Sequence, residues 1–96
     1  MSAPTRSSGN VFADLGHDSE EAALLLAETR LLAALASYVA GFDTQAEAAD
    51  ALALTQPRVS EIANGHLSKF SADLLIKLCH RAGLPVTVEA GHMATA

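Results

Sequence analysis

The 96-residue chain has no tryptophan, four aromatic residues in all and a single cysteine, Cys79. One cysteine excludes an intrachain disulfide and suits a reducing compartment. No uninterrupted apolar run reaches the roughly 18 residues of a membrane span, and the N-terminus lacks the apolar core of a signal peptide. We therefore expect a cytoplasmic protein with no membrane segment.

Patterns that support catalysis or metal binding are also missing. The four histidines do not have the spacing of metal ligands: His17, His66, His80 and His92. A zinc site needs more than one cysteine and scattered histidines. The sequence contains no nucleophile elbow, glycine-rich phosphate loop or paired-carboxylate motif. The sequence predicts neither an enzyme nor a bound metal or cofactor.

Residues 44–65 carry the clearest pattern, which predicts two short helices with a start signal on each. Thr44 and Glu47 have the spacing of a capping box, in which the hydroxyl accepts from an N–H of the first turn and the carboxylate accepts from the N–H of the cap residue. Thr55 can cap the second helix, and Pro57 fits its first turn, where no N–H is needed. Gly65 can take the left-handed conformation that ends a helix.

The residues between these signals predict how the two helices pack. Ala49 is small enough for close approach, and the larger apolar residues fall where the inner faces meet: Leu52, Leu54, Val59 and Ile62. This is the arrangement of a DNA-binding helix-turn-helix, whose second helix enters a major groove.

The motif resembles the Xre/Cro-type helix-turn-helix family of phage repressors and antitoxins. The resemblance rests on Thr-Gln-x-x-x-Ala at 44–49 and Thr-Gln-Pro-Arg-Val-Ser-x-Ile-x-x-Gly at 55–65. The family usually has glycine in the turn, where this chain has Ala53. Alanine there predicts either a less favourable positive φ or a slightly different turn.

The whole chain resembles a subgroup of that family, the HigA-like antitoxins. The matching segments are Asn-Val-Phe-Ala-Asp-Leu-Gly at 10–16, Gly-x-Leu-Ser-Lys-Phe-Ser at 65–71 and a valine-rich end. This resemblance implies the antitoxin of a type II toxin-antitoxin pair. Such a protein neutralises a toxin of the RelE fold and, as a dimer, represses the shared operon.

The predicted fold is all-α: a small lambda-repressor-like bundle with a long first helix and a short C-terminal β-strand. We divide the chain into a flexible N-terminal arm at 1–18, a helical domain at 19–83, and a strand and tail at 84–96. Within the arm, residues 10–16 are expected to be extended. A helix is predicted from Ser19 to Ala40 with Leu24 on its apolar stripe. Its C-terminal half is expected to be the first helix of the core and its N-terminal half an overhang. The alternation at 85–89 predicts the strand.

The net charge of −5 is unusual for a DNA-binding protein, because phosphate contacts dominate affinity. Residues 1–43 contain six acids and two bases, whereas residues 44–83 contain four of each, and Glu89 adds one acid. The acidity therefore lies outside the DNA-reading segment. A neutral segment predicts modest affinity for each monomer, which favours a homodimer on double-stranded operator DNA.

Eight residues are candidates for DNA contact: Gln45, Thr55, Gln56, Pro57, Arg58, Ser60, Asn64 and Lys69. Gln56 can read adenine, Pro57 can touch a thymine methyl group, and Arg58 can bind a guanine or a phosphate. The others suit phosphate or sugar, and the resemblance assigns Gln45 to a phosphate. Glu61 is the exception, since its carboxylate can accept from cytosine but repels phosphates.

A second set of residues is a candidate surface for a partner protein, or else is buried within the monomer or dimer: Val11, Phe12, Leu15, Leu24 and Leu25, with Leu26 beside them. Acidic residues among them would complement a basic toxin. Three functions stay open: an autorepressing antitoxin, a free-standing Xre-type regulator without a toxin, and an interaction module that has lost DNA binding.

Overall fold

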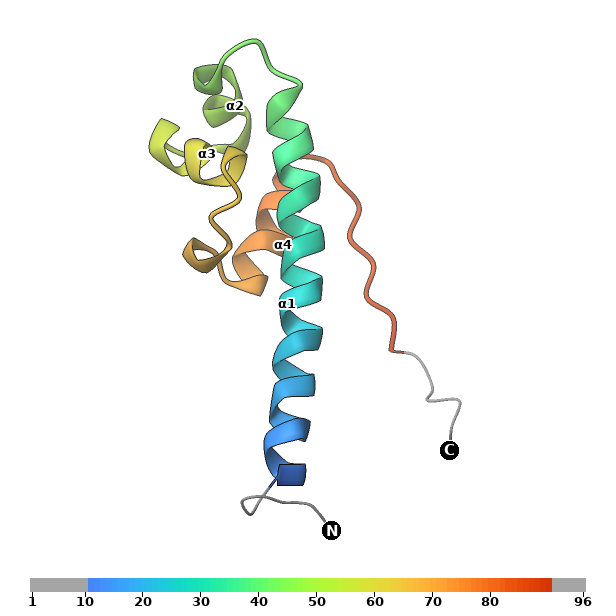
Figure 1. Ribbon diagram of the computed structural model, residues 1–96. Helices are drawn as coiled ribbons and strands as arrows, with labels where there is room; N and C mark the ends of the chain where they lie inside the picture. Colours follow the sequence, from blue (N-terminus) through green and yellow to red (C-terminus); the bar gives the residue numbers. More distant parts are fainter. Residues whose placement is uncertain (1–10, 91–96) are drawn as a thin grey trace.

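The computed structural model describes the backbone of residues 11–90 and the side chains of residues 19–90. The described elements are α1 (Val11–Ala40), α2 (Gln45–Leu52), α3 (Gln56–Ala63), the 3₁₀ turn η1 (Leu67–Lys69) and α4 (Ala72–Arg81). Helix α1 runs the length of the molecule, and the other helices pack against its C-terminal half (Figure 1). The result is an elongated body of 55 × 27 × 16 Å.

Helix α1 begins at Val11, earlier than the sequence predicts. The expectation of an extended segment at 10–16 is wrong for residues 11–16, which are helical, and Asn10 lies outside the described residues. The predicted start at Ser19 is an interior position of the helix. Extending an existing helix costs far less than nucleating one, so helix continues through this segment without a new cap. Gly41 follows the last residue of α1, and its N–H donates to the carbonyl of Tyr38 at 3.1 Å.

The core lies where α1, α3 and α4 meet, with α2 closing one end. Leu32, Leu35 and Val39 face it from α1, and Leu35 is completely buried. The other elements contribute the remaining buried residues: Ala48, Ala49, Leu52, Val59, Ile62, Phe70, Leu75, Leu78 and Cys79. Full burial of one leucine stabilises the fold by about 1.5–3 kcal/mol. The all-α bundle predicted from the sequence is confirmed.

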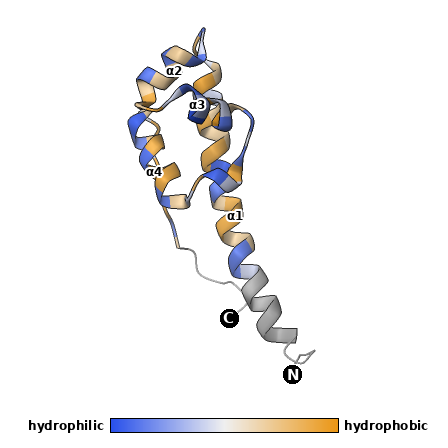
Figure 2. Cartoon of the chain, turned by 90° about the vertical axis from the view of Figure 1, so that its left-hand side faces the viewer, coloured by the Kyte–Doolittle hydropathy of each residue, from blue (hydrophilic) through white to orange (hydrophobic). Residues whose placement is uncertain are grey.

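The N-terminal half of α1 extends beyond the bundle. Leu24, Leu25 and Leu26 are each about half exposed, at 52%, 53% and 52%. The overhang predicted for this half of the helix is confirmed, because the bundle covers only the C-terminal half and leaves Leu24 exposed although it lies on the apolar stripe. Figure 2 shows the apolar colouring continuing along α1 below the bundle.

By length and composition alone, the stretch Ser19–Ala40 of α1 is also apolar enough to cross a membrane. This is weak evidence, because the core helix of a soluble bundle passes the same test. In this chain Leu32, Leu35 and Val39 bury the second half of the stretch against the other helices. Glu20, at its start, adds a charge that is costly in a bilayer.

The C-terminal segment after α4 is not a strand. Residues 84–90 have no regular secondary structure, so the predicted strand at 85–89 is not found in the described residues. An isolated strand leaves its backbone groups unpaired, and no other strand lies within residues 11–90 to pair with it. Instead, Leu84 and Val86 pack on the core while Val88 is 85% exposed.

Candidate nucleic-acid interface

Helices α2 and α3 each begin with a capped turn, as the sequence predicts. The Thr44 hydroxyl accepts from the N–H of Glu47 at 3.2 Å, and the Thr55 hydroxyl accepts from the N–H of Arg58 at 3.4 Å. Pro57 lies in the first turn of α3, where it removes no helical hydrogen bond. Because a cap contributes about 1 kcal/mol, these bonds set where each short helix starts.

The turn between the two helices has the left-handed residue that the motif requires. Ala53 has φ 56° and ψ 45°, so the first of the two predicted solutions, a positive φ on alanine, is confirmed. The N–H of Leu54 donates to Ala49 at 2.9 Å, and that of Ala53 donates to Asp50 at 3.3 Å. These two bonds form a Schellman motif, a helix ending in which glycine is the usual left-handed residue.

The apolar residues between α2 and α3 fix how the two helices cross. Leu52, Val59 and Ile62 are completely buried, and Ala49 is 5% exposed. Ala49, the small residue expected where the two helices meet, is thus part of the core. With these residues turned inward, the opposite face of α3 is left for contact with another molecule.

The outer face of the motif is polar and open at the start of both helices. Gln45 is the first residue of α2 and Gln56 the first of α3, and both are exposed, as is Pro57. The first turn of a recognition helix is the part that contacts base edges in a major groove. Their positions suit the roles that the sequence analysis predicts for them.

Ser60 and Asn64 form a pair near the end of α3. The Asn64 side-chain nitrogen donates to the Ser60 carbonyl at 2.9 Å and to its hydroxyl oxygen at 3.2 Å. The serine hydroxyl accepts in this bond, so its own hydrogen stays available to donate. The pair is therefore held in place and still able to contact a phosphate or sugar.

Arg58 lies in the first turn of α3, as the sequence predicts, and its side chain makes contacts within the protein. Its contact with DNA stays a prediction. Its Nη1 atom donates to the Glu61 carboxylate at 2.9 Å and to the Lys69 carbonyl at 3.1 Å. Its guanidinium carbon lies 4.5 Å from the centre of the Phe70 ring. The spacing of Arg58 and Glu61 gave a sequence signal for the ion pair, since residues three apart are neighbours on a helix. The contacts of Arg58 with Lys69 and Phe70 had no such signal in the sequence.

The ion pair also explains Glu61, the residue that does not suit a phosphate surface. Its carboxylate pairs with Arg58, with 25% of the glutamate side chain and 33% of the arginine side chain exposed. The charge of the recognition helix is thereby balanced internally. A second arginine, Arg81, is similarly occupied by the Leu52 carbonyl. Of the four cations at residues 44–83, Lys69 and Lys77 have exposed side chains, and neither donates a hydrogen bond to a carbonyl within the described residues.

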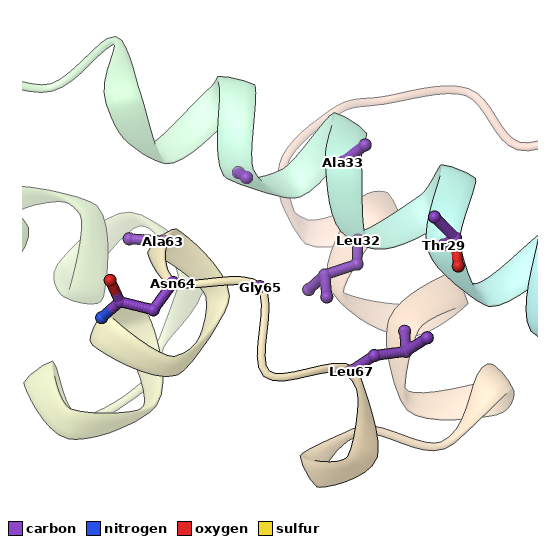
Figure 3. A pocket seen from close by; sticks show the side chains of 8 residues that line it. Thr29, Leu32, Ala33, Ala63, Asn64, Gly65 and Leu67 are labelled. Carbon is purple, nitrogen blue, oxygen red and sulfur yellow. The ribbon is translucent and has the colours of Figure 1, made fainter.

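A shallow groove lies beside the motif, between α1 and the end of α3 (Figure 3). Its volume is about 470 Å³, and it is lined mainly by small and apolar residues: Thr29, Leu32, Ala33, Ala36, Ala63, Asn64, Gly65 and Leu67. Gly65 has φ 72° and ends α3 as the sequence predicts.

The candidate partner surface is only partly described. Val11, Phe12 and Leu15 lie in the first turns of α1, but their side chains are outside the described part of the structure. Leu24 and Leu25 are exposed on the projecting part of the same helix. The binding of a partner by any of these residues stays a prediction.

The few described titratable groups with shifted pKa values lie in α4, away from the exposed face of α3. Burial raises the pKa of the Cys79 thiol, which is 1% exposed. A hydrogen bond from Ser71 is the main cause that lowers the pKa of the exposed Asp73 carboxyl. Among the side chains of residues 19–90, no three histidine, cysteine or acidic residues are grouped to hold a metal ion.

Comparison with protein families matches residues 11–91 to the helix-turn-helix domain family. The match covers most of the chain and all of its described helices, and the chain belongs to this family. No curated protein and no solved structure matches it. Family membership supports a helix-turn-helix DNA-binding protein, which agrees with the capped α2–α3 pair and its open outer face.

Proposed function

We propose that this protein is a sequence-specific transcriptional repressor that binds operator DNA through α2 and α3. The observation that carries the proposal is the exposure of Gln45 and Gln56 at the start of the two helices. In a helix-turn-helix these positions face phosphate and base edges. A glutamine can pair with adenine through two hydrogen bonds, which supplies the sequence preference that a repressor needs.

The direct test is selection from a pool of randomised duplexes, followed by measurement of binding at one fixed salt concentration. We expect the selected duplex to bind at least ~10³-fold more tightly than unrelated DNA of the same length, as specific regulators do. Equal binding of both duplexes would reduce the protein to a non-specific binder. No binding to either would favour the interaction module instead.

The unit on DNA is proposed to be a homodimer. The reading segment has no net charge, and two of its arginines bind carbonyl oxygens of the same chain. One motif therefore brings few phosphate contacts, and two motifs on a pseudo-palindrome would double them. Half-sites should lie about one helical turn apart. Sedimentation that shows only monomers at tens of micromolar, with a footprint over one half-site, would contradict the dimer.

We further propose that the protein is the antitoxin of a type II toxin-antitoxin pair. The resemblance of segments 10–16 and 65–71 to HigA-like antitoxins supports this role, as does the projecting part of α1. Leu24, Leu25 and Leu26 occupy consecutive positions, so they spread over about 200° of the helix circumference. A partner that covers them has to surround the helix, as a groove does.

Charge indicates the chemistry of that partner. Glu20 and Glu28 lie within a turn or so of the three leucines, and residues 1–43 have a net charge of −4. An apolar groove with a basic rim, as expected of a ribonuclease that grips RNA phosphates, complements such a helix. In this role the antitoxin neutralises a toxin of the RelE fold and represses the shared operon.

The toxin partnership is tested by replacing Leu24, Leu25 and Leu26 together with glutamine, which forms helix well. The variant should keep its helical content by circular dichroism and its DNA binding, yet fail to rescue cells from the toxin of the adjacent gene. Rescue by the folded variant would move the antitoxin surface elsewhere. A chromosome with no toxin-like reading frame beside this gene would favour the free-standing regulator.

The third function, an interaction module without DNA binding, has one observation in its favour. Arg58 and Glu61 neutralise one another on the recognition helix, and α3 contains no other cation. The selection experiment above distinguishes this module from a repressor.

A further inference from the structure

The side chain of Arg58 connects the recognition helix to the loop that follows it. From the first turn of α3 it reaches the carbonyl oxygen of Lys69, 11 residues further along the chain, at 3.1 Å. The same nitrogen, Nη1, bonds Glu61 at 2.9 Å on the next turn of α3. One guanidinium therefore holds two turns of α3 and the end of η1 in a fixed relation.

Phe70 is the third partner of Arg58, and its ring lies against the guanidinium. The Arg58 Cζ atom lies 4.5 Å from the centre of its ring, and Phe70 itself is 4% exposed. A cation over an aromatic face is attracted by the ring, and a buried ring cannot move to follow it. Three partners thus restrain Arg58, and Nη1 uses its donors within the protein, so it cannot bind a guanine without breaking these bonds.

The turn that Arg58 holds has little to stabilise it by itself. Element η1 has three residues, and its bonds are Lys69 N–H to His66 at 3.0 Å and Phe70 N–H to Leu67 at 3.1 Å. Short 3₁₀ turns have poor hydrogen-bond geometry and depend on their surroundings. The Arg58 bond to the Lys69 carbonyl therefore helps decide where the exposed Lys69 side chain is held.

We propose that Arg58 is a positioning residue of the DNA interface: it fixes η1 so that Lys69 meets a phosphate, and it does not itself read a base. Its pairing with Glu61 also removes an unbalanced negative charge from the face that approaches DNA. The inference rests on the proposed DNA binding. It assigns different roles to two candidate DNA-contact residues: Lys69 binds a phosphate, and Arg58 positions Lys69.

A double-mutant cycle separates this role from direct contact. If Arg58 acts through Lys69, then Arg58→Ala and Lys69→Ala should each weaken binding by about 3- to 10-fold, and each should lower the salt slope by about one. The double variant should bind within about twofold of the weaker single variant, because both changes remove the same phosphate contact. Multiplied losses in the double variant would overturn the proposal.

The affinity for single-base variants of the selected duplex gives a second readout. A positioning residue and a residue that reads a base affect these affinities differently. We expect Arg58→Ala to weaken binding to the selected duplex and to its single-base variants by the same factor. A loss confined to one guanine position would show that Arg58 reads that base and would overturn the proposal. Arg30→Ala, which removes an exposed arginine from α1, is the matched control and should leave binding unchanged.

Amide hydrogen exchange tests the positioning without DNA. In Arg58→Ala the amides of Lys69 and Phe70 should exchange at least ~10-fold faster, while the amides of the buried core of α1 keep their rates. Arg58→Lys retains the charge but loses the planar fork, so its exchange rates at Lys69 and Phe70 should lie between those of wild type and Arg58→Ala. If the wild-type protein binds DNA but the amides of Lys69 and Phe70 exchange at the same rate in Arg58→Ala, this proposal alone is overturned. A wild-type protein that binds no DNA would overturn the proposed function as well.

Discussion

The Nη1 atom of Arg81 lies 3.0 Å from the carbonyl oxygen of Leu52 and joins the last turn of α4 to the last turn of α2. The carbonyls at a helix C-terminus have no helical partner and carry partial negative charge, so a cation suits this position. Like Arg58, Arg81 completes the backbone hydrogen bonding of the motif. Two of the four bases of residues 44–83 therefore bind backbone carbonyl oxygens of the same chain.

Arg81→Ala should lower the free energy of unfolding by about 1 kcal/mol, because it removes a charge-assisted bond to a carbonyl that is partly screened by solvent. Urea unfolding followed by circular dichroism measures the change. Lys77→Ala, one turn earlier on the exposed side of α4, is the matched control and should stay within about 0.5 kcal/mol of wild type. Equal losses in both variants would mean that the bond to Leu52 contributes nothing.

Ala53→Gly should stabilise the protein by roughly 1 kcal/mol. A left-handed conformation costs an alanine about 1–2 kcal/mol, and glycine relieves this while adding some freedom to the unfolded chain. Gly65 and Gly83, at φ 72° and 73°, show that the chain ends α3 and α4 with glycine at the same position.

The matched control for this change is Ala51→Gly, two residues earlier on the exposed side of α2. A glycine within the helix should destabilise by up to about 1 kcal/mol, so the two substitutions are expected to have opposite signs. Thermal unfolding of both variants measures this. A loss of stability in both would show that Ala53 is not strained.

Cys79 should be inert in the folded protein. The thiol is buried on α4 and its pKa is raised by that burial, so little thiolate forms at neutral pH. Reaction with a disulfide reagent at neutral pH should be at least ~100-fold slower in the native protein than in urea, and limited by opening of the fold. Rapid native labelling of this single cysteine would instead indicate a loosely packed α4.

The Asp73 carboxyl should add a pH-dependent contribution to stability. Its pKa in the folded protein lies below the ordinary value of 3.8, chiefly because of a hydrogen bond from Ser71, the capping residue of α4. The ionised form therefore favours folding. This contribution is present above pH 3.8 and is lost as the pH falls through the lowered pKa.

Unfolding free energies of wild type and Asp73→Asn test the sign of this effect. Wild type should be the more stable at about pH 6, and the difference should shrink as the pH falls through the lowered pKa and the carboxyl becomes protonated. A difference that stays constant with pH would assign the effect of the substitution to something other than charge.

Local signals in the sequence predicted the helix-turn-helix well. The caps at Thr44 and Thr55, the positive φ at Ala53 and the glycine end at Gly65 depend on neighbouring residues only. Each can be recognised within a few positions of the chain. The inner faces of α2 and α3 followed from the helical period for the same reason.

Features that depend on distant residues could not be predicted in this way. The valines at 86 and 88 alternate as in a strand, but strand formation needs a partner that the sequence does not specify. The contacts of Arg58 with Lys69 and Phe70 could not be predicted from the sequence, because they join residues that come together only after folding.

The most direct test of the account is operator binding by Gln56→Ala at one fixed salt concentration, with Ser37→Ala on α1 as an exposed control outside the motif. A good base contact contributes roughly 1–3 kcal/mol, so the account predicts a loss of about 5- to 150-fold for Gln56→Ala. The loss should be confined to one base position, and Ser37→Ala should bind like wild type. Wild-type affinity and specificity in Gln56→Ala would contradict the claim that the start of α3 reads DNA.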